Sequence, residues 1–350
     1  RDRNGAILAT TDVVLPVSDE MDCRACHSSG SGPAARPSGG WAWNKTAEID
    51  YRLNILLKHD DRFASGATYR NAAAAVGYST AGLYPSVIVF NKAVLCANCH
   101  ASEALGTPGQ PGVPALTTSI HSLHATVTDP TNGQTLDASN NRTACYRCHP
   151  GAATKCLRGA MGHAVAADGT MEMQCQSCHG TMSQVGVSGR TGWLDEPSCQ
   201  NCHTGTATTN SGQIRYTSVF DTPGHRRQAA DQTFATNPDV PAPGYSLYRF
   251  SHGHGTEACE SCHGSTHAEF PSSHVNDNVQ SNNVQGHVGM LVECDACHGA
   301  QPQTTNGGPH GMHPVGQTWV SAHPDIAQGN QASCQPCHGT DYRGTVLSRA

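Results

Sequence analysis

The chain has 350 residues with a formal net charge of −6, and its hydrophobic, aromatic and charged fractions are 37%, 5% and 14%. So few aromatic side chains predict a thin conventional core, and the acidic balance argues against nucleic-acid binding. The longest apolar runs, such as residues 86–90, are too short to span a bilayer.

The predicted elements are short and lie far apart in the chain. We expect helices over residues 48–57, ending at His59, and over residues 118–124, because their apolar residues recur at helical spacing. Weak alternation predicts a short strand over residues 213–220. Glycine, proline, serine and threonine concentrate in four segments that we interpret as surface loops, residues 28–40, 106–114, 204–211 and 231–243.

One motif, Cys-x-x-Cys-His, occurs eight times and uses sixteen of the seventeen cysteines. Two thiols at this spacing form thioethers with the two vinyl groups of one haem, and the histidine that follows becomes the proximal iron ligand. We therefore predict eight haem c groups. The thioether cysteines are Cys23, Cys26, Cys96, Cys99, Cys145, Cys148, Cys175, Cys178, Cys199, Cys202, Cys259, Cys262, Cys294, Cys297, Cys334 and Cys337. The proximal histidines are His27, His100, His149, His179, His203, His263, His298 and His338.

Other uses of paired cysteines fit the motif less well. Zinc sites and disulfides both use cysteine pairs, yet neither explains why a histidine follows the second cysteine in all eight motifs. A thioredoxin-like redox site occurs once in a βαβ unit, whereas here the motifs are many and their surroundings are glycine-rich. The remaining cysteine, Cys156, we interpret as a buried thiol, with an intermolecular disulfide or a redox role as alternatives.

The spacing of the motifs bears on the fold. The intervals between successive first cysteines are irregular, so no tandem module is repeated. We expect residues 1–350 to form a single octahaem domain, mostly coil with short α-helices and few β-strands, wrapped around a stack of eight haems as a multihaem cytochrome c. In such a fold the macrocycles provide the buried apolar surface, and the thioethers tie the loops to it.

Distal ligands for the irons are expected from the thirteen of 21 histidines that lie outside the motifs. Because eight irons need eight such ligands, every haem can have two imidazoles. His121 and His124 share one helix face, and His59 ends a predicted helix. The best candidates are His59, His121, His124, His163, His254, His287, His313 and His323. The second-rank candidates are His225, His252, His267, His274 and His310.

Two imidazoles on each iron determine what the haems can do. An iron with both axial positions filled by the protein moves electrons and does no bond chemistry. We therefore expect an electron carrier rather than an enzyme. An octahaem reductase of nitrogen or sulfur compounds is an alternative that needs an open or lysine-ligated iron, although all eight motifs end in histidine and the chain has four lysines. A soluble periplasmic shuttle with the same haem chemistry is a further alternative.

Four short segments carry a resemblance to a known family. They are LLKHD at residues 56–60, SLHA at 122–125, CESCHGSTHA at 259–268 and GPHGMHP at 308–314. They resemble multihaem cytochromes of metal-reducing bacteria, including the extracellular nanowire-forming cytochromes of Geobacter. The resemblance implies bis-histidine haems in a continuous stack and subunits joined end to end as a homopolymeric filament. It also implies donor cytochromes and extracellular acceptors such as metal oxides or electrodes.

The thioether chemistry also predicts where the protein works. Haem c is attached outside the cytoplasm in bacteria, so we expect an exported protein, extracellular or at the cell surface, with the periplasm as the alternative. A chain that begins at Arg1 without an apolar signal segment fits a signal already removed.

Overall fold

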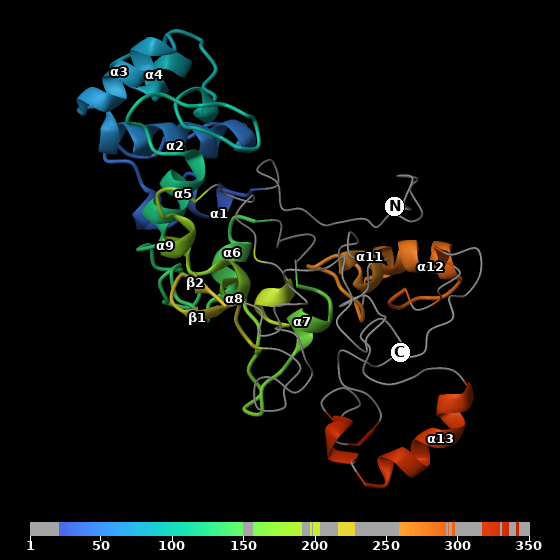
Figure 1. Ribbon diagram of the computed structural model, residues 1–350. Coiled ribbons are helices and arrows are strands. Elements are labelled where there is room, and N and C mark those ends of the chain that lie inside the picture. The colour runs from blue at the N-terminus through green and yellow to red at the C-terminus, as the bar shows by residue number, and fades with distance from the viewer. Residues whose placement is uncertain are drawn as a thin grey trace. The chain divides into compact units, whose positions relative to one another are not determined.

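The computed structural model describes twelve stretches of the chain: residues 21–149, 157–190, 197, 199–203, 216–227, 259–272, 274–291, 293, 296–297, 317–329, 331–335 and 341–342. This part of the chain is mostly coil with short helices and one two-stranded sheet, as predicted (Figure 1). Contacts divide the chain into two compact units. We call the described residues within Pro16–Lys155 and His179–Glu196 the N-terminal unit, and those within Cys156–Cys178 and Pro197–Ala350 the C-terminal unit. The single domain over residues 1–350 stays a prediction.

The N-terminal unit contains most of the longer helices. Its elements are α1 (Arg24–His27), η2 (Pro33–Ala35), α2 (Ala47–Phe63), α3 (Ala67–Ala75), α4 (Leu83–Ile88), η3 (Cys96–Asn98), α5 (Leu116–His124), α6 (Arg142–Tyr146) and α9 (Met182–Val185). The two predicted helices are confirmed and extend further, as α2 and α5. The loop predicted over residues 106–114 contains no helix or strand, only an isolated bridge from Thr107 to Ser102, whereas the predicted loop over residues 28–40 contains the short η2.

The C-terminal unit contains short helices and the sheet. Its elements are α7 (Ala160–His163), η6 (Cys199–Asn201), β1 (Phe220–Thr222), β2 (His225–Arg226), α11 (Glu260–His263), η8 (Val275–Asn278), α12 (Val279–Gln285), α13 (Gln317–Ala327) and η10 (Gln331–Ser333). Along the chain, the division between the units falls within helix α8 (Cys175–His179), after Cys178. No helix in the described stretches is long and apolar enough to cross a membrane.

The predicted strand over residues 213–220 is wrong over 216–219, where the backbone is coil, and residues 213–215 lie outside the described part. The strand begins at Phe220 and pairs antiparallel with β2. A Pro-Gly turn sets this register, because Gly224 has φ +79°, which the third residue of a type II turn requires. The two strands must flank that turn.

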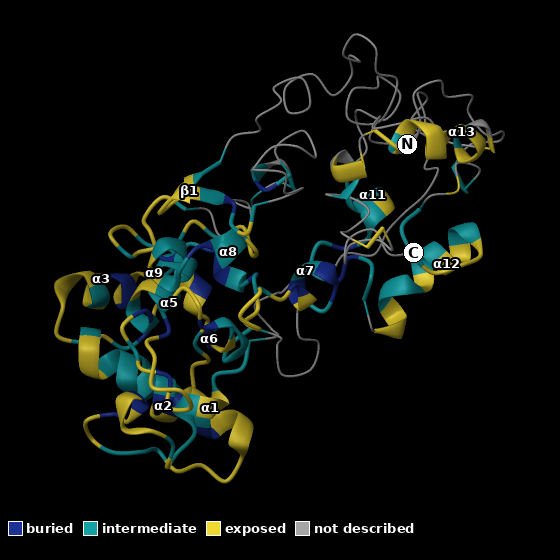
Figure 2. Cartoon of the chain, turned by 90° about the horizontal axis from the view of Figure 1, so that it is seen from below, coloured by how far each residue is buried: buried dark blue, intermediate teal, exposed yellow. Residues whose placement is uncertain are grey.

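The buried side chains are small. Among the described residues, nine of the fifteen buried hydrophobic residues are alanines, and Tyr78 is the only buried aromatic residue. The largest fully buried side chains are Met173, Asn54, Asp129 and Ser86, of which only Met173 is apolar. Buried residues form short stretches in both units (Figure 2). Alanine methyl groups alone do not fill a close-packed interior, so these side chains leave the thin core that the composition predicts.

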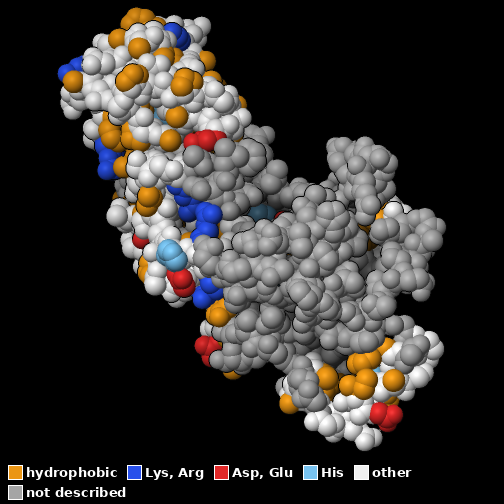
Figure 3. Space-filling model, in the orientation of Figure 1, with side chains coloured by type: hydrophobic (Ala, Val, Ile, Leu, Met, Phe, Trp, Pro, Cys, Tyr) orange, Lys and Arg blue, Asp and Glu red, His pale blue; other side chains and the backbone are white. Residues whose placement is uncertain are grey.

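Several large apolar side chains lie on the surface instead. Trp43 is 69% exposed, and Ile88, Val89 and Phe90, at the end of α4, are 52–66% exposed. Hydrophobic atoms are scattered over the face that carries α2, α3 and α4 (Figure 3). Among the described residues, the large aromatic side chains of Trp43 and Phe90 therefore do not contribute to a buried core.

Candidate functional site

The motifs share one backbone conformation wherever the structure describes their hydrogen bonds. In five of them, the N–H of the motif histidine donates to the carbonyl of the first cysteine at 2.9–3.0 Å, which is one helical turn. These five histidines are His27, His100, His149, His203 and His263. A helical turn places cysteines three residues apart on one side, with the imidazole adjacent to them. This arrangement lets two thiols and one imidazole reach the same cofactor.

Three motif histidines in the N-terminal unit each face a second histidine from elsewhere in the chain. The ring centroids of each pair are 6.1–6.4 Å apart. We name the pairs site 1, His27 with His124; site 2, His100 with His59; and site 3, His149 with His121. The second histidine of each pair is one of the best distal candidates from the sequence.

The separation within each pair fits one metal ion. A bond of about 2.0 Å from a metal to each imidazole nitrogen, with about 1.1 Å from that nitrogen to its ring centroid, gives centroids about 6.2 Å apart. The three observed separations lie within a few tenths of an ångström of this value. A haem iron needs only two protein ligands because the porphyrin provides four nitrogens. The paired histidines therefore fit the axial positions of haem iron.

Backbone carbonyls hold the two distal candidates on α5. Nδ1 of His121 lies 2.8 Å from the Thr117 carbonyl, and Nδ1 of His124 lies 2.7 Å from the Ile120 carbonyl. A carbonyl only accepts, so Nδ1 carries the proton in both rings, and Nε2 keeps a lone pair and points away from the helix backbone. This tautomer and orientation are those of a metal-binding histidine.

The motif histidine of site 2 is held in the same way. Nδ1 of His100 donates to the Pro114 carbonyl at 2.7 Å, and the Ser119 hydroxyl of α5 lies 3.2 Å from the same nitrogen. In the C-terminal unit, Nδ1 of His163 lies 2.8 Å from the Gly159 carbonyl. The roles of Pro114 and Ser119 could not be predicted from the sequence, because no local pattern signals a bond that depends on the path of the chain.

Burial lowers the pKa values of four of the six paired histidines and keeps these four imidazoles neutral. It lowers the pKa of His27 to about 4, with smaller effects from His124 and Lys58. It likewise lowers the pKa of His121 to about 4, and it lowers the pKa values of His59 and His149. A neutral imidazole is the form that binds a metal, so no proton has to leave first at neutral pH.

The distal candidate of site 2 lies in an aromatic environment. The ring of His59 is 5.0 Å from the Phe63 ring and 5.6 Å from the Tyr69 ring. The next residue, Asp60, accepts hydrogen bonds at 2.8 Å from the Tyr69 hydroxyl and from the backbone N–H groups of Leu83 and Tyr84. These bonds join α2 to α3 and α4 and fix the position of His59.

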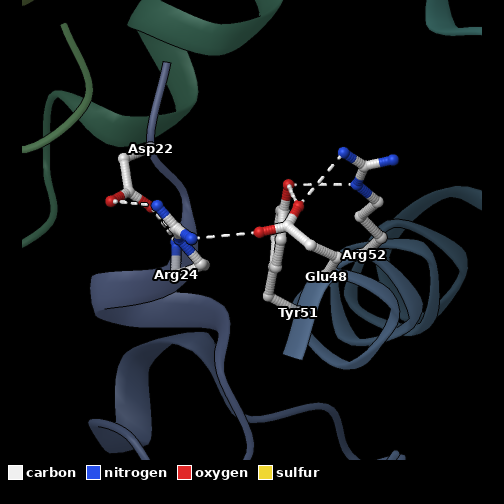
Figure 4. Close-up of polar contacts among 5 residues, drawn as sticks. All are labelled: Asp22, Arg24, Glu48, Tyr51 and Arg52. Carbon is white, nitrogen blue, oxygen red and sulfur yellow. Dashed lines mark hydrogen bonds and ion pairs between the residues drawn. The ribbon is translucent and has the colours of Figure 1, made fainter. Parts of the chain in front are cut away.

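The first motif is anchored to α2. Arg24, between its two cysteines, contacts Asp22 at 2.9 Å and Glu48 at 3.0 Å (Figure 4). Both carboxylates are exposed, so these ion pairs contribute little stability. Buried Asp50 makes the stronger link, because it accepts bonds from the Ser29 N–H at 2.7 Å and the Ser29 hydroxyl at 2.8 Å.

A buried ion pair anchors the third motif. Arg147, between the two cysteines of that motif, donates to Asp129 at 2.8 Å. The Asp129 side chain is fully buried and that of Arg147 is 22% exposed. Thr131 also donates to the same carboxylate through its N–H and hydroxyl groups. The motif is thus held against the loop that carries Asp129.

Other distal candidates in the C-terminal unit make local contacts. Nδ1 of His225 lies 2.6 Å from Asp221, and the His225 side chain is 65% exposed. Nδ1 of His274 accepts from the Asn276 N–H at 3.2 Å. Nδ1 of His287 lies 2.9 Å from the carbonyl of the next residue, and Nδ1 of His323 lies 2.9 Å from that of Val320. These bonds hold each ring close to its own segment.

Motif cysteines of the C-terminal unit lie near one another. The pKa of the Cys178 thiol is raised to about 12, by burial first and then by Cys202. The pKa of Cys199 is raised by its hydrogen bond with Cys259 and by burial. The fourth, fifth and sixth motifs are therefore neighbours. Eight residues of the predicted site lie outside the described part, namely His252, His254, Cys294, His298, His310, His313, Cys337 and His338, and so does Cys156.

Comparisons of the chain with protein-family models, curated proteins and solved structures found no match. The motifs and the three histidine pairs are therefore the features that indicate a function.

Proposed function

We propose that the chain is a c-type cytochrome that carries eight covalently attached haems and transfers electrons between them. The observation that carries the proposal is the set of three histidine pairs, each with centroids 6.1–6.4 Å apart and each containing a motif histidine. Zinc sites and disulfides do not require a motif histidine to face a second imidazole across the space of one metal ion.

Haem iron exchanges one electron reversibly, and its axial ligands tune the potential at which it does so. The chain provides an imidazole on both sides of each of the three sites, which excludes an exchangeable ligand from the iron. The hydrogen bonds on Nδ1 of His100, His121 and His124 increase the electron donation of these rings and favour low potentials. The same arrangement disfavours the reductase alternative at these sites.

The small buried side chains support the wrapping of the chain around haems. A core of alanines with few buried aromatic rings leaves apolar volume to be filled. Eight macrocycles, linked by thioethers to motifs along the chain, fill such volume and order a loop-rich chain.

Filament formation and an extracellular location form part of this proposal through the resemblance to nanowire-forming cytochromes. The proposed partners are further copies of the chain, donor cytochromes, and acceptors such as metal oxides or electrodes. Electron microscopy of the purified protein on negatively stained grids tests the assembly. Micrometre-long filaments support the conduit, whereas dispersed particles favour the soluble shuttle.

The haem content tests the central proposal. The chain is expressed with a c-type cytochrome maturation system, and its haem is measured after denaturation in alkaline pyridine. We expect eight covalently bound haems per chain and an oxidised spectrum that is low-spin throughout. A chain without covalent haem contradicts the proposal, and a native high-spin fraction that binds small ligands favours a reductase.

A further inference from the structure

The three sites of the N-terminal unit need not follow one another in chain order. We propose that site 1 lies between sites 2 and 3, so that electrons crossing this unit pass in the order site 2, site 1, site 3. The inference rests on the proposed function, because it concerns the route between the same histidine pairs.

Sites 1 and 3 share helix α5. Their distal candidates, His124 and His121, are three residues apart, so their side chains lie on the same face with Cβ atoms about 5–6 Å apart. Each faces its own motif histidine. Two ligands on one helical turn bring the two sites into adjacent positions.

A direct bond also joins the motifs of sites 1 and 3. The N–H of Asp22, next to the first cysteine of site 1, donates to the carbonyl of Cys148 at 2.8 Å. Cys148 immediately precedes the motif histidine of site 3. The two motifs therefore touch at their backbones, although about 120 residues separate them in the chain.

Sites 1 and 2 share helix α2. The start of α2 holds the first motif through Glu48 and Asp50, and the same helix carries His59 of site 2 further along.

Helix α5 lies between sites 2 and 3. Its Ser119 contacts His100 of site 2. At about 100° per residue, Ser119 lies about 160° around the helix from His121 and about 140° from His124. Site 2 therefore meets the face of α5 opposite the one that carries the ligands of sites 1 and 3, whereas the shared helix α2 joins site 2 to site 1.

The iron positions in the complete holoprotein test this order directly. Anomalous scattering from crystals of the haem-loaded chain locates each iron, and the attached cysteines identify it. We expect the iron of site 1 to be the nearest neighbour of both other irons. Haem in all three sites with the iron of site 2 or site 3 in the middle overturns the order and leaves the proposed function intact. A chain without covalent haem overturns both.

A pair of matched variants gives a second measurement. Methionine in place of a distal histidine raises the potential of its haem. A haem that is reduced earlier carries one positive charge less and lowers the apparent potentials of its neighbours, more strongly at shorter distance. Potentiometric titrations that follow each haem separately measure these apparent potentials. We expect His124→Met to lower the apparent potentials of the haems at sites 2 and 3. We expect the control His59→Met to lower that of site 1 but not that of site 3. Equal shifts of sites 1 and 3 in His59→Met overturn the order.

Discussion

The two units of the chain hold their candidate distal histidines in different ways. In the N-terminal unit, α2 and α5 carry His59, His121 and His124 to motif histidines that are distant in sequence. In the C-terminal unit, by contrast, His225 is bonded to the carboxylate of Asp221, four residues before it in the chain. The difference shows what fixes a ligand pair: a helix rigid enough to present an imidazole, and a tertiary contact that brings a motif to it.

The solvent exposure of the histidine side chains differs between the two units in the same way. Burial holds His27 and His121 neutral with pKa values of about 4, whereas the side chain of His225 is 65% exposed beside the carboxylate of Asp221. An exposed imidazole that is already hydrogen-bonded to a carboxylate, such as that of His225, is a weaker candidate for an iron ligand. The comparison therefore ranks His59, His121 and His124 above His225 as axial ligands.

Removal of single distal candidates tests this ranking of axial ligands most directly. We expect His59→Ala, His121→Ala or His124→Ala to convert one haem in eight from low-spin to high-spin, because no second imidazole then closes the axial position. Absorption and electron paramagnetic resonance spectra of the purified protein measure the change, and carbon monoxide binds the opened iron after reduction. The matched control, His225→Ala, leaves the spectra unchanged. A high-spin haem in His225→Ala, or none in His59→Ala, reverses the ranking.

The stabilities of the two units are compared through their buried ion pairs. Asp129 pairs with Arg147 in the N-terminal unit, and Asp277 pairs with Arg158 at 2.6 Å in the C-terminal unit. We expect Asp129→Asn and Asp277→Asn each to lower the free energy of unfolding by about 3 kcal/mol, because each leaves a largely buried guanidinium without its charge partner. Thermal unfolding measures the loss.

Hydrogen exchange then shows where each variant loosens. We expect faster exchange in the N-terminal unit for Asp129→Asn and in the C-terminal unit for Asp277→Asn. Arg52→Ala is the control, because its ion pair with Glu48 is exposed on both sides and contributes little. Equal loosening of both units in either aspartate variant contradicts the division of the chain into two units.

The loss of stability at low pH is expected to differ less between the two units than the effect of their buried ion pairs. Burial raises the pKa of Asp50, but hydrogen bonds from Ser29 and Asn44 outweigh it and hold this pKa below its ordinary value. The ionised Asp50 carboxylate therefore stabilises the folded protein fully above the pKa of aspartate in the unfolded chain, about 3.9. This stabilisation is lost as the pH falls through the lower pKa of Asp50 in the folded protein. We expect Asp50→Asn to remove part of the pH dependence of stability below about pH 4.

The control for this experiment comes from the C-terminal unit. Asp221 also has a lowered pKa, through its hydrogen bond to His225, but it lies on an exposed hairpin where solvent screens the interaction. We expect Asp221→Asn to change the acid unfolding curve less than Asp50→Asn. An equal change in both variants shows that burial of the carboxylate does not decide the effect.

The sequence predicted the parts of the molecule that local pattern determines. The helices at residues 48–57 and 118–124 followed from apolar spacing, and their histidines are the ones that the structure places opposite motif histidines. The Pro-Gly dipeptide before His225 also predicts a turn. Had it been used, the predicted strand would have been placed directly before this turn, beginning near Phe220.

Long-range contacts could not be predicted in this way. The sequence did not indicate which motif each distal candidate faces, because that depends on contacts such as the bond from Asp22 to Cys148. Nor did it indicate that Pro114 and Ser119 orient His100, since neither residue type is a signal for such a bond. The helix α3, rich in alanine, was also missed because it lacks apolar periodicity.

The smallest expected effect distinguishes sites within the N-terminal unit. The imidazole planes meet at 75° in site 1 and 89° in site 2, but at 16° in site 3. Nearly perpendicular planes leave two iron d orbitals close in energy and give a highly anisotropic ferric low-spin signal, whereas nearly parallel planes separate those orbitals and give a rhombic signal. Axial ligation is one of the means by which a protein tunes its haem. We therefore expect sites 1 and 2 to give the anisotropic type of electron paramagnetic resonance signal and site 3 to give the rhombic type.

Single variants assign these signals to sites. His121→Ala removes a rhombic signal because it opens site 3, and His59→Ala removes an anisotropic one because it opens site 2. The two variants remove the same type of side chain from two sites of one unit, so any general loosening of the unit affects both alike. If His121→Ala removes an anisotropic signal instead, the ring orientations at site 3 change when iron binds between them. In that case the separation of the ring centroids at site 3 still holds with iron bound, but the angle between the two imidazole planes does not.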